Sequence, residues 1–188
     1  MVVSIAESMD GRIWMGMRDV GLFASAHGRV VRIASESGDE KINALTADFN
    51  GGIWAGTDHG IYFVTIAGKM TDPLPAWTHQ HQILTLFRDR DDCIWAGTNH
   101  GLIRINPAGQ ASFRATSGNE EVNAVFQDRE QNLWYGGPGG LERLQDGVFS
   151  PYSAEESFPP APIGPIFADG DGGIWFAPLT LPKSMMIL

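Results

Sequence analysis

A short phrase that ends in tryptophan occurs five times in this chain at nearly constant intervals, and it constrains the fold more than any other feature. The intervals between successive tryptophans are 40, 41, 39 and 41 residues, and the residues are Trp14, Trp54, Trp95, Trp134 and Trp175. A period of this length is typical of proteins in which one supersecondary unit is repeated and stacked. The chain is therefore expected to fold as an array of similar units.

Each copy of the unit has the same order of apolar and acidic positions. Valine or isoleucine stands twelve residues before each tryptophan, and isoleucine, leucine or valine stands nine residues before it. An aspartate stands six residues before four of the tryptophans, and Ser8 takes this place in the first copy; the aspartates are Asp48, Asp89, Asp128 and Asp169. Because a carboxylate can accept backbone N–H groups a few residues on, these aspartates are expected to cap turns.

Turns marked by glycine separate four short apolar segments in the complete copies of the unit. The segments are too short for helices and are rich in isoleucine, valine, phenylalanine, tryptophan and leucine, which is typical of strands. We therefore interpret each unit as a four-stranded antiparallel meander. The first segment is apolar on both faces, as expected for a strand between neighbouring sheets, and the tryptophan is expected to pack between adjacent units.

These features predict an all-β fold: one β-propeller fragment over residues 1–188, with four full four-stranded antiparallel blades and a partial fifth. The expected blades are residues 1–33, 41–71, 82–116, 121–152 and 162–188. Because propellers close with about four to eight blades, three arrangements are open: an arc of a larger propeller, a five-bladed ring completed by Met185 to Leu188, or closure between chains. The arc is favoured, and its uncovered apolar faces would make self-association possible.

The composition excludes several classes of partner. Thirteen lysines and arginines against 22 aspartates and glutamates give a net charge of −9, which argues against binding to nucleic acid or to an anionic membrane surface. No run approaches the ~18 apolar residues of a membrane helix, and no signal peptide is visible. The single cysteine, Cys93, excludes an intrachain disulfide, and its place among the turn residues of the other copies predicts an exposed, unreactive thiol.

Residues 42–61 and 83–102 both read [Val/Ile]-x-x-[Ile/Leu]-x-x-Asp-x-x-x-x-[Ile/Leu]-Trp-x-Gly-Thr-x-x-Gly-[Ile/Leu]. This pattern resembles the two-component regulator propeller repeat. The resemblance implies β-propeller blades in the sensor region of a bacterial hybrid histidine kinase, often as seven-bladed propellers, at a periplasmic or other extracytoplasmic location. It also implies that the kinase and further blades lie outside this chain. The copies at Trp134 and Trp175 depart from the pattern, since Tyr-Gly-Gly-Pro and Phe-Ala-Pro follow these tryptophans.

The chain contains none of the usual catalytic or nucleotide-binding motifs, so we expect no catalytic residue, no metal site and no cofactor. Long loops on a rigid scaffold are frequent recognition sites. The candidate ligand-binding residues are His59 and His100 in equivalent turns, Arg18 in the matching turn of the first copy, and Trp77, His79 and His81 in the longest connection, residues 72–82. Each also has an ordinary interpretation as a turn residue or as the cover of a blade end.

The leading functional hypothesis is a non-catalytic module that binds a small molecule or a carbohydrate and signals to a histidine kinase outside the chain. The ligand class and the signalling follow from the resemblance, because the fold alone does not determine function. One alternative is an enzyme, since Asp-Gly-Asp-Gly-Gly-Ile-Trp-Phe at 169–176 is similar to repeats of the streptogramin B lyase type. That resemblance implies a histidine and acidic residues near the axis with a metal ion. A further alternative is a purely structural protein-interaction propeller.

Overall fold

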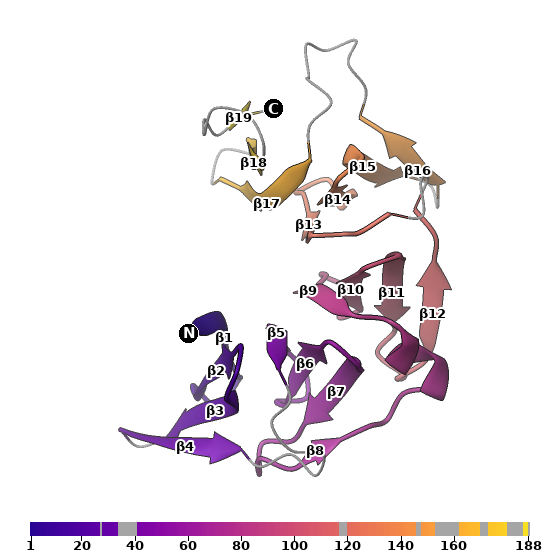
Figure 1. Cartoon of the computed structure of the whole chain (residues 1–188). Helices are drawn as coiled ribbons and strands as arrows, with labels where there is room; N and C mark the ends of the chain where they lie inside the picture. The colour runs from indigo at the N-terminus through magenta and orange to yellow at the C-terminus, as the bar shows by residue number, and fades with distance from the viewer. Residues whose placement is uncertain are drawn as a thin grey trace.

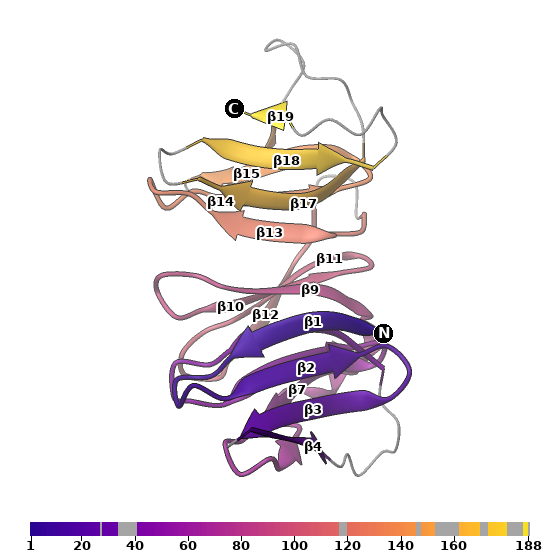
Figure 2. The same cartoon turned by 90° about the vertical axis from the view of Figure 1, so that its left-hand side faces the viewer.

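The computed structural model consists of five antiparallel sheets, and Figure 1 shows them arranged around a common centre as an open arc. The structure describes residues 1–26, 28–33, 41–116, 120–145, 148–152, 162–169, 173–179 and 186–187. The prediction of an all-β propeller arc is confirmed. Figure 2 looks at the open side of the arc, where the first and last sheets both face the viewer. The five sheets do not form the closed ring that was considered as an alternative.

The first three blades are complete four-stranded meanders in which each strand pairs with the next along the chain. Blade 1 comprises β1 (Val2–Glu7), β2 (Ile13–Met17), β3 (Gly21–Ala26) and β4 (Arg29–Ile33). Blade 2 comprises β5 (Ile42–Ala47), β6 (Ile53–Thr57), β7 (Gly60–Val64) and β8 (Met70–Thr71). Blade 3 comprises β9 (Ile83–Arg88), β10 (Ile94–Thr98), β11 (Gly101–Ile105) and β12 (Ala111–Arg114).

The last two blades follow the same order. Blade 4 comprises β13 (Ala124–Gln127), β14 (Leu133–Gly137), β15 (Gly140–Gln145) and β16 (Val148–Pro151). The described part of blade 5 comprises β17 (Ile163–Ala168), β18 (Ile174–Pro178) and β19 (Met186–Ile187), and β19 pairs with β18. In the five-bladed-ring alternative Met185 to Leu188 would complete the last sheet; of these, Met185 and Leu188 lie outside the described residues. The first strand of every blade lines the inner side of the arc in Figure 1.

The repeated tryptophans pack between blades. Trp14, Trp54, Trp95 and Trp134 are buried, and each belongs to an apolar cluster that includes residues of the following blade. Trp14, for example, contacts the cluster that contains Ile42 and Leu45 of blade 2. Trp175, in the last blade, is only half-buried. The large rings therefore join successive sheets into one continuous core.

The aspartates six residues earlier hold these tryptophans as well as their own turns. The indole Nε1 donates to a carboxylate oxygen in four blades, at 2.9 Å to Asp48 and at 2.7 Å to Asp89, Asp128 and Asp169. In blade 1 the hydroxyl of Ser8 accepts the bond from Trp14 at 2.9 Å and itself donates to Asp10 at 2.6 Å. The pair Ser8 and Asp10 thus replaces the single aspartate of the other copies.

The structure corrects the expectation for the cysteine. Cys93 is 1% exposed, because its side chain turns into the gap between blades 3 and 4 while its N–H donates to Asp89 at 2.8 Å. Burial and the nearby Asp89 carboxylate raise the pKa of the Cys93 thiol, although the charge of Arg104 acts in the opposite direction. The thiol is therefore expected to be unreactive because it is buried and protonated, and not because it is an incidental surface group.

The connection between blades 2 and 3 also differs from the expected irregular loop. It contains a short 3-10 helix, η1 (Ala76–Gln80), which packs against β7. Two backbone hydrogen bonds stabilise this helix, one from the Thr78 N–H to the Pro75 carbonyl and one from the His81 N–H to the Thr78 carbonyl. Within the residues that the structure describes, no helix has the length and apolarity required to cross a membrane.

Candidate functional site

The predicted ligand-binding residues all lie on one face of the arc. In an antiparallel meander successive strands alternate in direction, so the start of the first strand, the turn between the second and third strands and the end of the fourth strand lie at the same end. We call this end the connection face, because it also carries the links between blades. Its candidate residues are Arg18, His59 and His100 in the turns and Trp77, His79 and His81 in the link from blade 2 to blade 3.

The turns that carry His59 and His100 have the same internal geometry. The hydroxyl of Thr57 accepts a bond from the His59 N–H at 3.0 Å and donates to the Gly60 carbonyl at 3.1 Å. Thr98 makes the equivalent bonds with His100 and Gly101, at 3.1 and 2.9 Å. The glycines have φ angles of 115° and 129°, a conformation that few other residues adopt. Both turns are therefore rigid, and both imidazoles are exposed on them.

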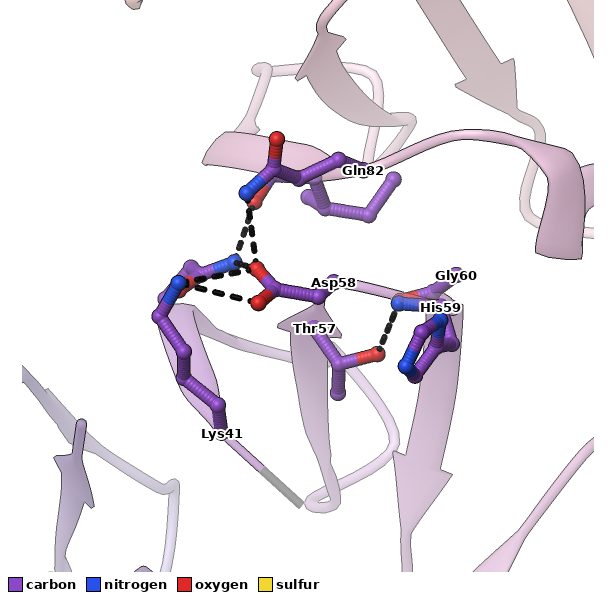
Figure 3. Close-up of polar contacts among 8 residues, drawn as sticks. Lys41, Thr57, Asp58, His59, Gly60 and Gln82 are labelled. Carbon is purple, nitrogen blue, oxygen red and sulfur yellow. Dashed lines mark hydrogen bonds and ion pairs between the residues drawn. The ribbon is translucent and has the colours of Figure 1, made fainter. Parts of the chain in front are cut away.

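A polar cluster around Asp58 lies between blades 2 and 3 on the same face (Figure 3). The Asp58 carboxylate accepts bonds from the Lys41 ammonium at 2.9 and 3.1 Å, from the Asn43 amide at 2.7 Å and from the Gln82 amide at 2.8 Å. The same Asn43 amide also donates to the Ile83 carbonyl at 3.0 Å. Since Gln82 and Ile83 belong to the start of blade 3, the cluster ties the inner ends of two blades together.

The cluster keeps Asp58 ionised. Partial burial raises the pKa of its carboxyl, but the bonds from Asn43, Lys41 and Gln82 and the charge of Lys41 outweigh that effect and lower the pKa to about 2. All the bonds that the described residues make to this carboxylate come from within the cluster, so it is a fixed negative charge on the connection face. We interpret Asp58 as a group that positions its neighbours.

A strip of aromatic rings runs outward from this cluster over η1. The His79 ring stacks on Tyr62 of blade 2 at 5.9 Å between centroids, and its Nε2 lies 3.0 Å from the Asp72 carboxylate. The His81 ring stacks on Phe113 of blade 3 at 5.0 Å. Trp77 meets the edge of His81 at 6.2 Å. Burial and the charge of the neighbouring His100 lower the pKa of His81, which favours its neutral form.

We define the aromatic strip as Trp77, His79, His81, His100 and Phe113. Trp77, His79 and His81 are half-buried, whereas His100 is exposed and Phe113 is 40% exposed. Trp77 also packs against the apolar core of blades 2 and 3, so it covers a blade end as well as belonging to the strip. This packing fits the ordinary interpretation of Trp77 as the cover of a blade end.

The structure does not bring every predicted residue into this strip. Arg18 lies on the blade 1 turn, where its N–H bonds to the Met1 carbonyl at 3.3 Å, and no contact joins it to the strip within the described part of the chain. His59 lies beside the strip, because the neighbouring Gly60 abuts His79. Sequence reasoning missed Lys41, Asn43, Asp58, Gln82 and Phe113. The only signal for them was that Asp58 occupies the repeat position of Asn99.

The described residues contain no group of three or more histidine, cysteine, aspartate or glutamate side chains arranged to hold a metal ion. The histidines among them lie in the turns and the link of the connection face. The arrangement instead offers aromatic faces, amide groups and imidazole nitrogens on a rigid surface. These are groups that bind a ligand through stacking and hydrogen bonds.

Residues 79–100, which start in η1 and end in the β10–β11 turn, match the family model described as two component regulator propeller. The chain contains a two component regulator propeller repeat. The match covers the link that carries His79 and His81, the first two strands of blade 3 and His100. Part of the aromatic strip is therefore built from the two component regulator propeller repeat itself. No curated protein sequence matches the chain.

Solved structures that resemble the chain include extracellular domains assigned to two component systems and a lyase. One is an extracellular domain assigned to the hybrid two component system BT4673 of B. thetaiotaomicron, with a TM-score of 0.80, 21% identity, and coverage of 98% of this chain and 27% of that one. Another is the corresponding BT3049 domain of the same organism, with a TM-score of 0.75, 20% identity, and coverage of 100% and 28%. The third is virginiamycin B lyase from Staphylococcus aureus, with a TM-score of 0.75, 16% identity, and coverage of 98% and 68%.

These likenesses bear on the fold. At 16 to 21% identity they show that the two component regulator propeller repeat of this chain is part of a propeller arc. The chain spans about a quarter of the length of the two extracellular domains, 27% and 28%. The blade count of the chain is consistent with an arc of a larger propeller, as predicted.

Proposed function

We propose that this chain is a non-catalytic, ligand-binding arc of a sensor propeller, and that its ligand is a carbohydrate that contacts the aromatic strip. The observation that carries the proposal is the placement of exposed Phe113 and His100 beside half-buried Trp77 and His81 on one rigid face. Aromatic faces with a few polar groups beside them are typical of binding sites. Loops held by a rigid scaffold are where such sites usually lie.

The chemistry of the strip suits a sugar ring. One face of many pyranose rings presents C–H groups, which pack on an aromatic face such as that of Phe113, while the hydroxyl groups at the edge need hydrogen-bond partners. His100 of the strip and Asn99 beside it, both on the β10–β11 turn, can supply donors and acceptors. The rigid turn around Thr98 means that little conformational entropy is lost when these groups bind.

The signalling part of the proposal rests on the family match and on the fold. The solved propellers that resemble the chain include extracellular domains assigned to hybrid two component systems. By analogy, we propose that the chain belongs to the extracytoplasmic, ligand-sensing region of a longer protein, that it is periplasmic or otherwise extracytoplasmic, and that other blades and a histidine kinase of the same protein are its partners.

The proposal is tested by applying the labelled chain to an array of oligosaccharides. We expect a defined subset of glycans to bind. The Phe113→Ser chain should bind them about tenfold more weakly, a loss of about 1.4 kcal/mol, because it lacks the aromatic face on which the sugar packs. The matched control is Val30→Ser, which removes an exposed apolar side chain from β4 of blade 1. A chain that binds no glycan, or a Phe113→Ser chain that binds as well as its parent, would contradict the proposal.

A lyase-type enzyme is the second candidate, because virginiamycin B lyase has the same fold over 98% of this chain. The test is incubation of the purified chain with virginiamycin B and a divalent metal ion, followed by chromatography for a cleaved product. Turnover would contradict the non-catalytic proposal. A purely structural interaction propeller would show neither turnover nor glycan binding, and would instead be captured by a defined protein partner.

A further inference from the structure

A cleft opens in the gap between neighbouring blades, next to the repeated tryptophan. Between blades 2 and 3 it has a volume of about 280 Å³ and is lined by Trp54, Phe63 and Pro73, among others. The rings of Trp54 and Phe63 lie 5.0 Å apart. This cleft is therefore an apolar one, with an aromatic pair on the wall that blade 2 contributes.

The equivalent cleft between blades 3 and 4 has a volume of about 320 Å³ and a different character. The repeat positions of Phe63 and Pro73 are occupied by Arg104 and Arg114, which both line it. The Arg104 guanidinium lies over the Trp95 ring at 5.6 Å from its centroid, and its Nη2 donates to the Cys93 sulfur at 2.9 Å. A cationic wall thus replaces the aromatic wall of the preceding gap.

The strand register brings the two arginines together. Arg104 of β11 lies directly opposite Trp95 of β10 and Ser112 of β12, and Arg114 stands two residues beyond Ser112. Residues two apart in a strand share a face, and diagonal neighbours across a pair of strands are within reach of long side chains. Arg104 and Arg114 therefore project from the same face of blade 3, toward blade 4.

Both guanidinium groups have N–H donors that no described residue of the chain accepts. Arg114 is exposed, and its guanidinium makes no hydrogen bond or ion pair with any other residue that the structure describes. Arg104 bonds within this part of the chain only to Cys93, which uses one of its five N–H donors. The carboxylate of Asp89, a buried acid that lines the cleft, already accepts the N–H groups of Cys93 and Trp95. The Asp89 carboxylate therefore competes only weakly with a ligand for the two guanidinium groups.

The rest of the lining fits a small amphipathic anion. Blade 4 contributes the amide side chains of Gln127 and Gln131 and the apolar side chains of Leu133 and Leu144. The Gln131 amide can bond hydroxyl or carbonyl groups, whereas the Gln127 amide already accepts the Arg90 N–H and donates to the Gln131 carbonyl. The leucines can pack against a hydrocarbon body. Arginine is the side chain best suited to a carboxylate, which it can bind through two parallel N–H groups. Asp91 at the exposed edge of the cleft disfavours ligands of high negative charge.

We propose that the cleft between blades 3 and 4 is a binding site for a small organic acid with one carboxylate, held by Arg104 and Arg114 with its body against Leu133 and Leu144. The site is separate from the aromatic strip and does not rest on the function proposed for it. A blade gap that is apolar in one repeat and cationic in the next gives the same scaffold two different ligand preferences.

The test uses NMR of arginine side-chain Nε–H groups in the full chain, titrated with two acids and their neutral counterparts: D-glucuronate against D-glucose, and benzoate against benzyl alcohol. At low salt we expect saturable shifts of the Arg104 and Arg114 signals with at least one acid and none with the neutral compounds. Arg114→Gln should weaken the binding about tenfold, because it removes charge-assisted bonds from an exposed side chain without disturbing the core.

Two control variants distinguish binding in this cleft from binding elsewhere on the chain. Arg29→Gln, which changes an exposed arginine of β4 in blade 1, should leave the binding unchanged, and so should Phe113→Ser in the aromatic strip. The proposal is overturned if neither acid shifts the two arginine signals, if the neutral compounds shift them equally, or if Arg114→Gln binds as well as its parent. Loss of binding in Phe113→Ser would place the acid on the connection face and would also overturn it.

Discussion

The indole Nε1 of Trp95 donates a hydrogen bond of 2.7 Å to the carboxylate of Asp89, six residues earlier on the other side of the β9–β10 turn. The other oxygen of the same carboxylate accepts the N–H groups of Asp91 and Cys93, at 3.0 and 2.8 Å. One side chain therefore fixes both the turn and the ring that packs against blade 4. The recurrence of this arrangement in other blades explains why aspartate and tryptophan keep their spacing.

Asp89→Ala should destabilise the chain by about 1.5–3 kcal/mol, because it leaves a buried indole N–H and two turn N–H groups without their charged acceptor. Urea unfolding followed by circular dichroism measures the change. The matched control is Asp91→Ala in the same turn, since the Asp91 side chain is exposed and makes no hydrogen bond with the described residues. Equal effects of the two substitutions would show that the buried hydrogen bond to Trp95 is not what stabilises the blade.

Trp95→Ala should cost roughly 3–5 kcal/mol, as expected for truncation of a large buried ring. Trp77→Ala should cost less, roughly 1–2 kcal/mol, because Trp77 is half-buried against the core of blades 2 and 3. The same unfolding measurement ranks the two variants. A Trp77→Ala chain as unstable as Trp95→Ala would mean that η1 is an essential part of the core.

Acid should weaken the polar cluster around Asp58, which joins blades 2 and 3. The pKa of Asp58 is about 2 in the folded chain, below its ordinary value of 3.8, so its contribution to stability is complete above pH 3.8 and is lost as the pH falls toward 2. Asp58→Asn should therefore lower the melting temperature at pH 6, and its melting temperature should fall less between pH 4 and pH 2 than that of the parent chain. The control is Asp19→Asn, in the exposed turn of blade 1. Parallel melting curves for the Asp58→Asn and parent chains across this range would contradict the assignment.

The pKa of His81 should depend on the neighbouring His100. Burial and the nearby charge of His100 lower the pKa of His81 below its ordinary value of 6.5, so the stability that neutral His81 provides is complete above pH 6.5 and declines as the pH falls below it. His100→Ala removes the repulsive charge and should raise the pKa of His81. NMR titration of the His81 ring proton measures the shift, and an unchanged or lower pKa would exclude the coupling.

The open end of blade 1 should make the isolated chain self-associate. Ile5 is 64% exposed, whereas its repeat equivalents Leu45 and Val125 are 7% exposed because the preceding blade covers them. Sedimentation velocity should show association that increases with concentration and is reduced by Ile5→Lys. Val30→Lys, which changes an equally exposed apolar residue of β4, is the control and should have little effect. A chain that stays monomeric at high concentration would show that the exposed face of blade 1 does not drive self-association.

The spacing of the tryptophans predicted the fold because each copy carries its own strands and turns, which are local features. The aspartate six residues before each tryptophan is predicted from the sequence as a turn cap. Its hydrogen bond to the indole is not predicted, because spacing alone does not show which way a ring points. Cys93 shows the same limit: the turn was predicted, but the direction of the side chain into the blade gap was not.

The candidate site was less predictable because its parts come from different blades. The loop residues Trp77, His79, His81, His59 and His100 could be selected by their position in long or equivalent connections. The contact of Asp58 with Gln82 depends on how blade 2 lies against blade 3, and the ring of Phe113 reaches His81 from the fourth strand of blade 3. Such contacts are set by the packing of repeats and leave no local pattern.

Binding of a carbohydrate to the aromatic strip can be located by hydrogen exchange of the chain with and without a glycan selected on the array. We expect the glycan to slow backbone exchange in residues 76–82, 99–101 and 111–114, and Phe113→Ser to abolish this protection. Protection confined to blade 1, or to the cleft between blades 3 and 4, would contradict carbohydrate binding at the strip.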